Sequence, residues 1–335
     1  ACTVYLLAGA LGDVRSNIRR RYSGFGKHPR DYLAVNFAIP VADAERPLVN
    51  RLFQGVFETS FQYAESQAGH PPLPLRELAD LAHSLDRNMT RPSMGGPCFI
   101  YPEVSAGVQG FVRSRTSRGG LYLFSDTGAA TVDQSVFILR HTRNEGDMLT
   151  YLDAAVLPLG SSQLEQRAAE SAGDLSWKTL EEWRKRKEAG EDAFYLTIAR
   201  NHVGEQLKEK TVATLFRARR KLNADNITEQ LQDFRVMFGG GGHVENPYAK
   251  SVLRAFDDER VFGSRPPHPD VVGMPLPNDL EPSESLSRWM SRLWVAYGLS
   301  FWRDELAEHM YPSQVPKGRP IRNRLEIESI RKEDV

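Results

Sequence analysis

The sequence is poor in cysteine. Only Cys2 and Cys98 occur among its 335 residues, and they stand far apart, without the CxxC or Cys/His spacing of a metal site. Two such cysteines cannot form the disulfide framework of a small secreted domain. The scarcity of cysteine argues against a zinc centre and favours a protein of the reducing cytoplasm.

The sequence also lacks an excess of one charge and a long apolar run. Its 43 basic residues balance 43 acidic ones, so no broad electrostatic field attracts nucleic acid or an anionic membrane. No apolar run approaches the roughly 20 residues that cross a bilayer. The apolar start of the chain lacks the basic residues of a signal peptide. We therefore expect neither nucleic acid nor a membrane as a partner.

The chain is long enough for two lobes. Its 335 residues exceed what one compact core usually supports, so two lobes with a cleft are expected. The residue pattern predicts a strand over residues 31–40, ended by a proline that cannot donate to a sheet. Apolar spacing predicts helices over residues 4–21, 45–67, 75–85, 176–190 and 285–309.

The most informative segment joins two short apolar stretches by a tight turn. Leu121–Phe124 and Val136–Leu139 are nearly unbroken runs of aliphatic and aromatic residues, which predicts two strands of a covered sheet. The turn between them carries two carboxylates, a hydroxyl and three small residues: Asp126, Gly128, Ala129, Ala130, Thr131 and Asp133.

Small residues in this turn allow its backbone N–H groups to approach an anion, since no large side chain stands in the way. Carboxylates beside a phosphate make sense when a divalent cation is present, usually magnesium with water ligands. The alternative is an ordinary hairpin, in which the Asp and Thr side chains stabilise the turn itself. This segment alone leaves both interpretations open.

A second segment runs from an apolar stretch into four glycines. Phe234–Phe238 predicts a strand, Gly239–Gly242 follow it, and residues 248–256 are compatible with a helix. Consecutive glycines cost backbone entropy and add no packing, so close contact with a flat or anionic group explains them, with a flexible loop as the alternative. A P-loop is excluded because no Gly-Lys-Ser/Thr follows.

Taken together and in this order, the segments resemble the actin-like ATPase superfamily, most closely the ATPase domain of the seventy-kilodalton heat-shock chaperones. Asp126-Thr-Gly-Ala-Ala-Thr-Val-Asp133 is similar to the family's second phosphate motif, Asp-x-Gly-Gly-Gly-Thr-x-Asp, with alanines replacing two glycines. Four further stretches are similar to the first connecting helix, the start of the second lobe's first helix, the adenosine motif and the second connecting helix: Pro102–Gly110, Leu159–Arg167, Val236–Gly240 and Val295–Leu299.

The resemblance implies a two-lobed actin-like (ribonuclease H-like) α/β fold, with mixed central sheets flanked by helices. It divides the chain into a partial first lobe, a second lobe with a helical subdomain at about residues 161–230, a connecting helix and an extended tail: residues 1–118, 119–288, 289–310 and 311–335.

Two parts of the family pattern have no counterpart: the glycine-containing first phosphate hairpin and a later lysine. Asp13–Asn17 shares some residue types with that hairpin motif, but it falls inside the helix predicted over residues 4–21. We therefore expect either a fragment that lacks the opening sheet of the first lobe or a degenerate family member.

The resemblance implies an ATP-binding switch domain that holds Mg²⁺ with ATP or ADP between its lobes and hydrolyses ATP. The implied catalytic residues are Glu103, Asp126, Thr131 and Asp133, with Asp126 and Asp133 holding magnesium through water. The implied nucleotide contacts are Thr127, Gly128, Ala129, Ala130, Gly160, Lys185, Arg186, Gly239, Gly240, Gly241 and His243. A protein partner or client is also expected.

Several of these assignments have alternatives. Lys185 and Arg186 lie in the charged helix predicted over residues 176–190, where Glu and Lys or Arg pairs would stabilise a solvated face. His243 stands where the chaperones carry an arginine beside the purine, but a loop histidine without that role is equally consistent. A non-catalytic nucleotide-binding scaffold and a filament-forming cytomotive protein of the same fold remain alternatives to an ATPase.

Overall fold

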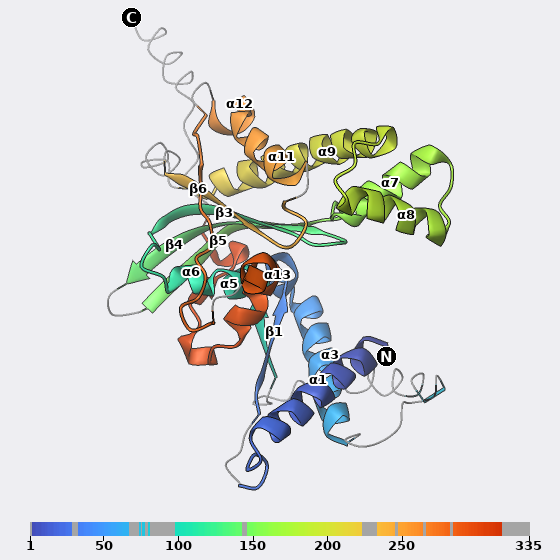
Figure 1. Cartoon of the computed structure of the whole chain (residues 1–335). Coiled ribbons are helices and arrows are strands. Elements are labelled where there is room, and N and C mark those ends of the chain that lie inside the picture. The colour runs from blue at the N-terminus through green and yellow to red at the C-terminus, as the bar shows by residue number, and fades with distance from the viewer. Residues whose placement is uncertain are drawn as a thin grey trace, which may run out of the picture. The chain divides into compact units, whose positions relative to one another are not determined.

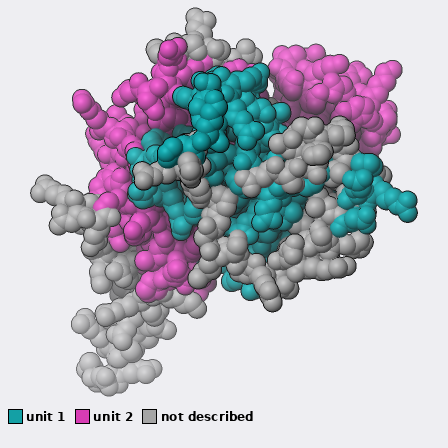
Figure 2. All heavy atoms as spheres, turned by 90° about the horizontal axis from the view of Figure 1, so that it is seen from below, with its two compact units in different colours: residues 1–106, 298–306 teal, residues 107–297, 307–335 magenta. Residues whose placement is uncertain are grey.

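The computed structural model describes residues 2–28, 33–66, 74, 76–77, 80, 98–142, 146–222, 233–244, 247–263, 266–281 and 284–316. The chain divides into two compact units, each described by itself (Figure 2). Unit 1 comprises residues 1–106 and 298–306, and unit 2 comprises residues 107–297 and 307–335. The helix predicted over residues 75–85 falls largely outside the described residues. Within the described part, no helix is long and apolar enough to cross a bilayer.

Unit 1 combines two parallel strands with a pair of helices (Figure 1). Its elements are α1 (Cys2–Arg21), β1 (Val35–Ile39), α2 (Val41–Ala44), α3 (Pro47–Ser66), β2 (Cys98–Pro102), most of α5 (Glu103–Gly107) and the 3-10 turn η3 (Arg303–Glu305). β1 runs parallel to β2 and ends before Pro40, as the sequence predicts. α1 packs on α3 and buries Val4, Ala8 and Leu11, which confirms the helix predicted over residues 4–21.

Unit 2 is built on a six-stranded sheet with the strand order β7-β6-β3-β4-β5-β8. The strands are β3 (Gly120–Thr127), β4 (Val132–Thr142), β5 (Gly146–Leu157), β6 (Phe234–Gly239), β7 (Asp270–Val271) and β8 (Glu308–Met310). β3, β4 and β5 are antiparallel neighbours, whereas β6, β7 and β8 pair in parallel with β3, β6 and β5. This mixed sheet, with helices flanking it, confirms the predicted α/β class.

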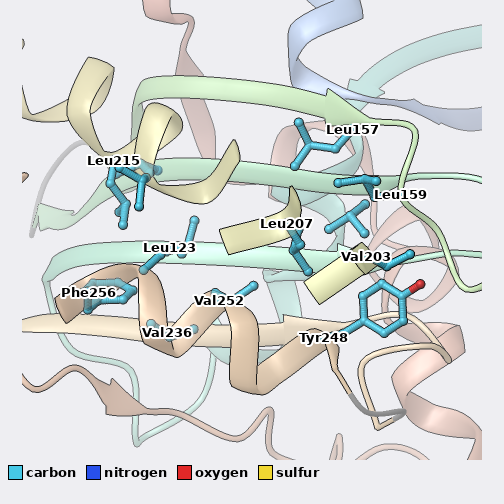
Figure 3. Close-up of a cluster of buried hydrophobic side chains, with 14 of the residues drawn as sticks. Leu123, Leu157, Leu159, Val203, Leu207, Leu215, Val236, Tyr248, Val252 and Phe256 are labelled. Atoms are coloured by element: carbon cyan, nitrogen blue, oxygen red, sulfur yellow. The ribbon is translucent and has the colours of Figure 1, made fainter. Parts of the chain in front are cut away.

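The helices of unit 2 pack on this sheet or on one another. They are α6 (Gln109–Val112), α7 (Ser162–Ala172), α8 (Trp177–Glu188), α9 (Phe194–Arg219), α11 (Tyr248–Arg254), α12 (Glu259–Phe262) and α13 (Glu284–Leu299), with the 3-10 turns η2 (Ala255–Asp257) and η4 (Pro312–Gln314). α9 and α11 bury an apolar cluster against the sheet that includes Leu123, Val203 and Val252 (Figure 3). The next residue of β3, Phe124, points to the opposite face, where it lies against Gly107.

α5 and α13 cross closely. A Cβ atom on Gly298 would overlap the carbonyl oxygen of Ala106, so this approach requires a residue without a side chain. These are the two segments that the sequence likens to the connecting helices of the family.

Two boundaries differ from the sequence-based expectation. Residues 107–118, expected in the first lobe, belong to unit 2, where Phe111 of α6 packs edge-on against Tyr122 of β3 with ring centroids 5.7 Å apart. The helix expected to continue past residue 300 ends at Leu299, and the chain then forms η3 and β8. β8 pairs with β5, so its backbone groups are satisfied at the sheet edge and not within a longer helix.

Candidate functional site

The β3–β4 turn places two carboxylates side by side. The antiparallel register pairs Asp126 with Asp133 and Thr127 with Val132. The Gly128 amide donates to the Thr131 carbonyl at 2.9 Å, which closes the turn. The Thr131 hydroxyl donates to Asp133 Oδ2 at 2.9 Å. The hairpin that the sequence predicts therefore holds its polar side chains at one end of the sheet.

Three consecutive backbone amides of the loop between β5 and α7 donate hydrogen bonds to this turn. Gly160 N donates to Ala130 O at 3.1 Å, Ser161 N to Gly128 O at 2.9 Å, and Ser162 N to Ala129 O at 2.8 Å. A Cβ atom on Gly160 would overlap the backbone of Ala129 and Ala130, so glycine is required at this contact.

These hydrogen bonds orient the turn. Because the carbonyl groups of Gly128, Ala129 and Ala130 all accept from the 160–162 loop, their acceptors are occupied on that side. Ala129 and Ala130 are exposed, and no hydrogen bond of the described residues uses the amide of either one. Free amides in an exposed turn of small residues form a concavity that binds anions.

The glycine run after β6 lies against the same hairpin. Gly242 N donates to Thr127 O at 2.9 Å. Gly240 adopts φ +75°, and a Cβ atom on it would overlap Asp126 Oδ1. A Cβ atom on Gly239 would stand 3.0 Å from Asp126 Oδ2. The structure thus brings together, within unit 2, the two glycine-bearing bends that the sequence singles out.

Burial and charge act together on Asp126. Its desolvation, and then the negative charge of Asp133, raise the pKa of the Asp126 carboxyl to about 6. Two carboxylates that repel each other suit a hydrated divalent cation, which would relieve the repulsion. No group of three or more His, Cys, Asp or Glu side chains among the described residues could enclose a metal, so a magnesium ion here would keep most of its water ligands.

A buried ion pair, which the sequence analysis did not identify, supports the 160–162 loop. Lys187 Nζ lies 2.6 Å from Glu165 Oε2 and donates to Ser161 O at 3.1 Å. The two side chains are only 5% and 11% exposed. Lys187 belongs to the charged helix read from the sequence as a solvated face, and its charge pattern gives no signal that one lysine points inward.

Lys185 and Arg186, the predicted nucleotide contacts on α8, form ion pairs with nearby residues. Lys185 pairs with Glu181 at 3.6 Å, and its side chain is 72% exposed. Arg186 pairs with Glu191 at 2.8 Å and lies over the ring of Trp183. No contact of either residue with the glycine loops is found in the described part of the chain, so their proposed role stays a prediction.

His243 turns back onto its own loop. Its Nδ1 lies 2.6 Å from Gly240 O, and its ring is parallel to that of Phe238. The histidine lines an open hollow of about 400 Å³, together with residues of β6, of the segment that begins with β7 and of α13: Phe238, Val271, Val272, Gly273, Met274, Leu276, Met290, Ser291 and Trp294. An apolar, partly aromatic lining of this kind suits a flat ring such as the purine, beside which the resemblance places His243.

Glu103 is the one predicted catalytic residue that lies in unit 1. It is the first residue of α5, where a carboxylate is favourable at the helix N-terminus. The remaining predicted residues all belong to unit 2.

Comparisons with known proteins give structural likenesses only. No protein-family model and no curated protein matches the sequence. One similar solved structure is the PilM-PilN type IV pilus biogenesis complex, with a TM-score of 0.43 and 16% identity over 88% of this chain and 84% of that one. Another is a non-polymerisable quadruple mutant of pCBH ParM, with a TM-score of 0.37 and 14% identity over 68% of this chain and 67% of that one. Likenesses at this level identify neither a ligand nor an activity.

Proposed function

We propose that unit 2 is a nucleotide-binding domain of actin type, which holds the phosphates of ATP or ADP at the β3–β4 turn. The observation that carries this proposal is the turn itself: its carbonyls accept from the 160–162 loop, while the exposed residues Ala129 and Ala130 use their amides in no hydrogen bond of the described residues. Such amides are suited to phosphate oxygens. The resemblance assigns the α-phosphate and ribose to Gly239 and Gly240, which lie directly against Asp126 of the same hairpin.

Asp126 and Asp133 would hold a hydrated magnesium ion beside these phosphates. The ion would neutralise phosphate charge, which is the main requirement of phosphoryl transfer. Thr131 would exchange its present acceptor, Asp133 Oδ2, for an oxygen of the terminal phosphate.

Hydrolysis would require water to attack the terminal phosphorus, break its bond to the bridging oxygen and lose a proton. A carboxylate of the hairpin, Asp126 or Asp133, would accept that proton. Glu103 is the further residue proposed to orient the water. A chaperone-like or other protein partner, and a cytoplasmic location, remain parts of this proposal that the sequence alone suggests.

Binding of Mg-ATP, followed by calorimetry, tests the proposal. Asp126→Asn should weaken Mg-ATP binding by at least about tenfold and abolish phosphate release, because it removes a charged acceptor near the metal. Asp257→Asn, a change of the same kind at an exposed carboxylate in η2, should alter neither. Unchanged turnover in Asp126→Asn would reject the site. Binding without phosphate release in the wild-type protein would identify a non-catalytic scaffold.

A further inference from the structure

Arg292 of α13 lies against the glycine run in a space that only glycine leaves open. A Cβ atom on Gly241 would overlap Arg292 Nε, and it would stand 3.0 Å from Cζ and 3.1 Å from Nη2. The guanidinium therefore occupies the volume that a side chain at position 241 would fill. The arginine is otherwise exposed to solvent.

Two further contacts fix the position of this arginine. Its Cζ lies 4.8 Å from the centroid of the Trp289 ring, one turn earlier on the same helix. An indole face attracts a guanidinium and limits the number of rotamers it samples. The helix itself is joined to the loop, because Gly240 N donates to Ser291 O at 3.0 Å. Three contacts therefore keep Arg292 beside the glycine run: the packing against Gly241, the Trp289 ring on its own helix, and the backbone hydrogen bond between Gly240 and Ser291.

No carboxylate of the described residues neutralises the charge of Arg292. Two other arginines on helices of unit 2 form ion pairs: Arg254 with Glu205 at 2.7 Å, and Arg217 with Asp153 at 2.8 Å. Among the described residues, Arg292 makes no ion pair. An ordered guanidinium without a counter-charge is a ready partner for an anion.

The charge of the candidate site calls for such a cation. The hairpin contributes the carboxylates Asp126 and Asp133, and Asp126 faces Gly240 of the same glycine run. A polyphosphate bound here would add further negative charge. The sequence offers no lysine at the place where the family resemblance would have it. Arg292 reaches the same loop from a helix about fifty residues further along the chain.

We propose that Arg292 is a phosphate-binding residue of the nucleotide site, donating guanidinium N–H bonds to phosphate oxygens. This inference rests on the proposed function and specifies it, because it assigns the ligand as a nucleoside di- or triphosphate and not a nucleoside. An arginine can bind phosphate through two parallel N–H bonds, whereas a lysine offers only a point charge.

Calorimetric titration of ATP, ADP and adenosine into Arg292→Gln and Arg292→Lys tests the assignment. Arg292→Gln should weaken ATP and ADP binding by at least about tenfold, the usual size of a lost charge-assisted contact, and leave adenosine affinity unchanged. Arg292→Lys should retain part of the affinity because it keeps the charge. Arg254→Gln, which removes an arginine already paired with Glu205, should bind all three ligands as the wild type does.

Three results would overturn the assignment. Wild-type affinity for ATP in Arg292→Gln would show that the guanidinium makes no phosphate contact. An equal loss for ATP and adenosine would show that it supports the loop or stacks on the base. Failure of the wild-type protein to bind either nucleotide would reject the proposed function and this assignment with it. Because Arg292→Lys keeps the length and charge of the side chain, it also decides the question if the glutamine variant does not fold.

Discussion

The Asp126 carboxylate is surrounded by groups that disfavour its charge. Burial and the neighbouring charge of Asp133 raise its pKa to about 6, well above its ordinary value of 3.8. An ionised carboxylate held in such surroundings costs folding free energy, and strongly shifted carboxylates of this kind gather at functional sites. The cost disappears when a proton or a cation occupies the site.

The shifted pKa predicts how stability depends on pH. Between about pH 4 and 6 the folded state holds a proton on Asp126 that the unfolded chain has lost, so this group lowers the free energy of unfolding as pH rises. Asp126→Asn removes the effect, and without nucleotide or Mg²⁺ it should become more stable than the wild type by about 3 kcal/mol at pH 7. Urea unfolding of both proteins at pH 4 to 7 measures the difference.

The free energies of unfolding of the wild type and the variant must be compared at each pH, because a second group changes stability with pH in the opposite direction. Burial lowers the pKa of His309 in β8 to about 4, so the folded protein loses stability as pH falls below the unfolded value of 6.5. This contribution is common to wild type and variant and cancels in their difference. A difference that does not change with pH would show that Asp126 is not desolvated in the folded protein.

At the scale of elements, α8 supports the β3–β4 turn through a chain of contacts. Lys187 of α8 holds Glu165 of α7 and the carbonyl of Ser161, and the amides of the same loop hold the turn between β3 and β4. The helix thereby fixes a loop that belongs to a distant part of the sequence. A shift of α8 would be transmitted directly to the turn amides.

Loss of Lys187 should therefore be strongly destabilising. Lys187→Met leaves Glu165 buried without a partner and should lower the free energy of unfolding by about 3 kcal/mol. The double variant Lys187→Met/Glu165→Met should recover most of that loss, since apolar pairs of similar volume often replace buried ion pairs. Denaturant titration measures both, with Lys185→Met, exposed on the same helix, as the control expected to change little.

The double variant also separates stability from binding. If the ion pair only stabilises the helices, the recovered protein should bind Mg-ATP like the wild type. If the ion pair positions the 160–162 loop, as the bond from Lys187 to Ser161 O suggests, the double variant should bind Mg-ATP more weakly than the wild type although its stability has recovered. A Lys187→Met protein as stable as the wild type would contradict the burial of this pair.

At the scale of the whole molecule, the proposed ligand should stabilise the folded chain. A ligand that binds only the folded state at about 100 times its dissociation constant adds about 2.7 kcal/mol to the free energy of unfolding. Scanning calorimetry should show a higher transition temperature with Mg-ATP, and a smaller rise when EDTA removes the metal. Adenosine alone should give the smallest change, because it lacks the phosphates that the turn would bind. Equal effects of ATP with and without EDTA would contradict a metal at Asp126 and Asp133.

Local patterns determined much of this protein from sequence. The hairpin around Gly128, the strand before Gly239 and the helix of residues 2–21 follow from apolar runs, small turn residues and helical spacing, which depend only on near neighbours in the chain. The α/β class is implied by the family resemblance of these segments in their order, and the mixed sheet of unit 2 confirms it.

Tertiary structure alone decided which distant groups meet. The inward turn of Lys187, the seat of Arg292 on Gly241 and the end of α13 at Leu299 depend on contacts between segments far apart in sequence. The sequence pattern predicts a solvated lysine in a charged helix, and only the structure shows that Glu165 of another helix pairs with it in the interior. The residues after Leu299 have a helical pattern, but Glu308–Met310 form strand β8 and pair with β5. Tertiary hydrogen bonding therefore outweighs local helix propensity in this segment.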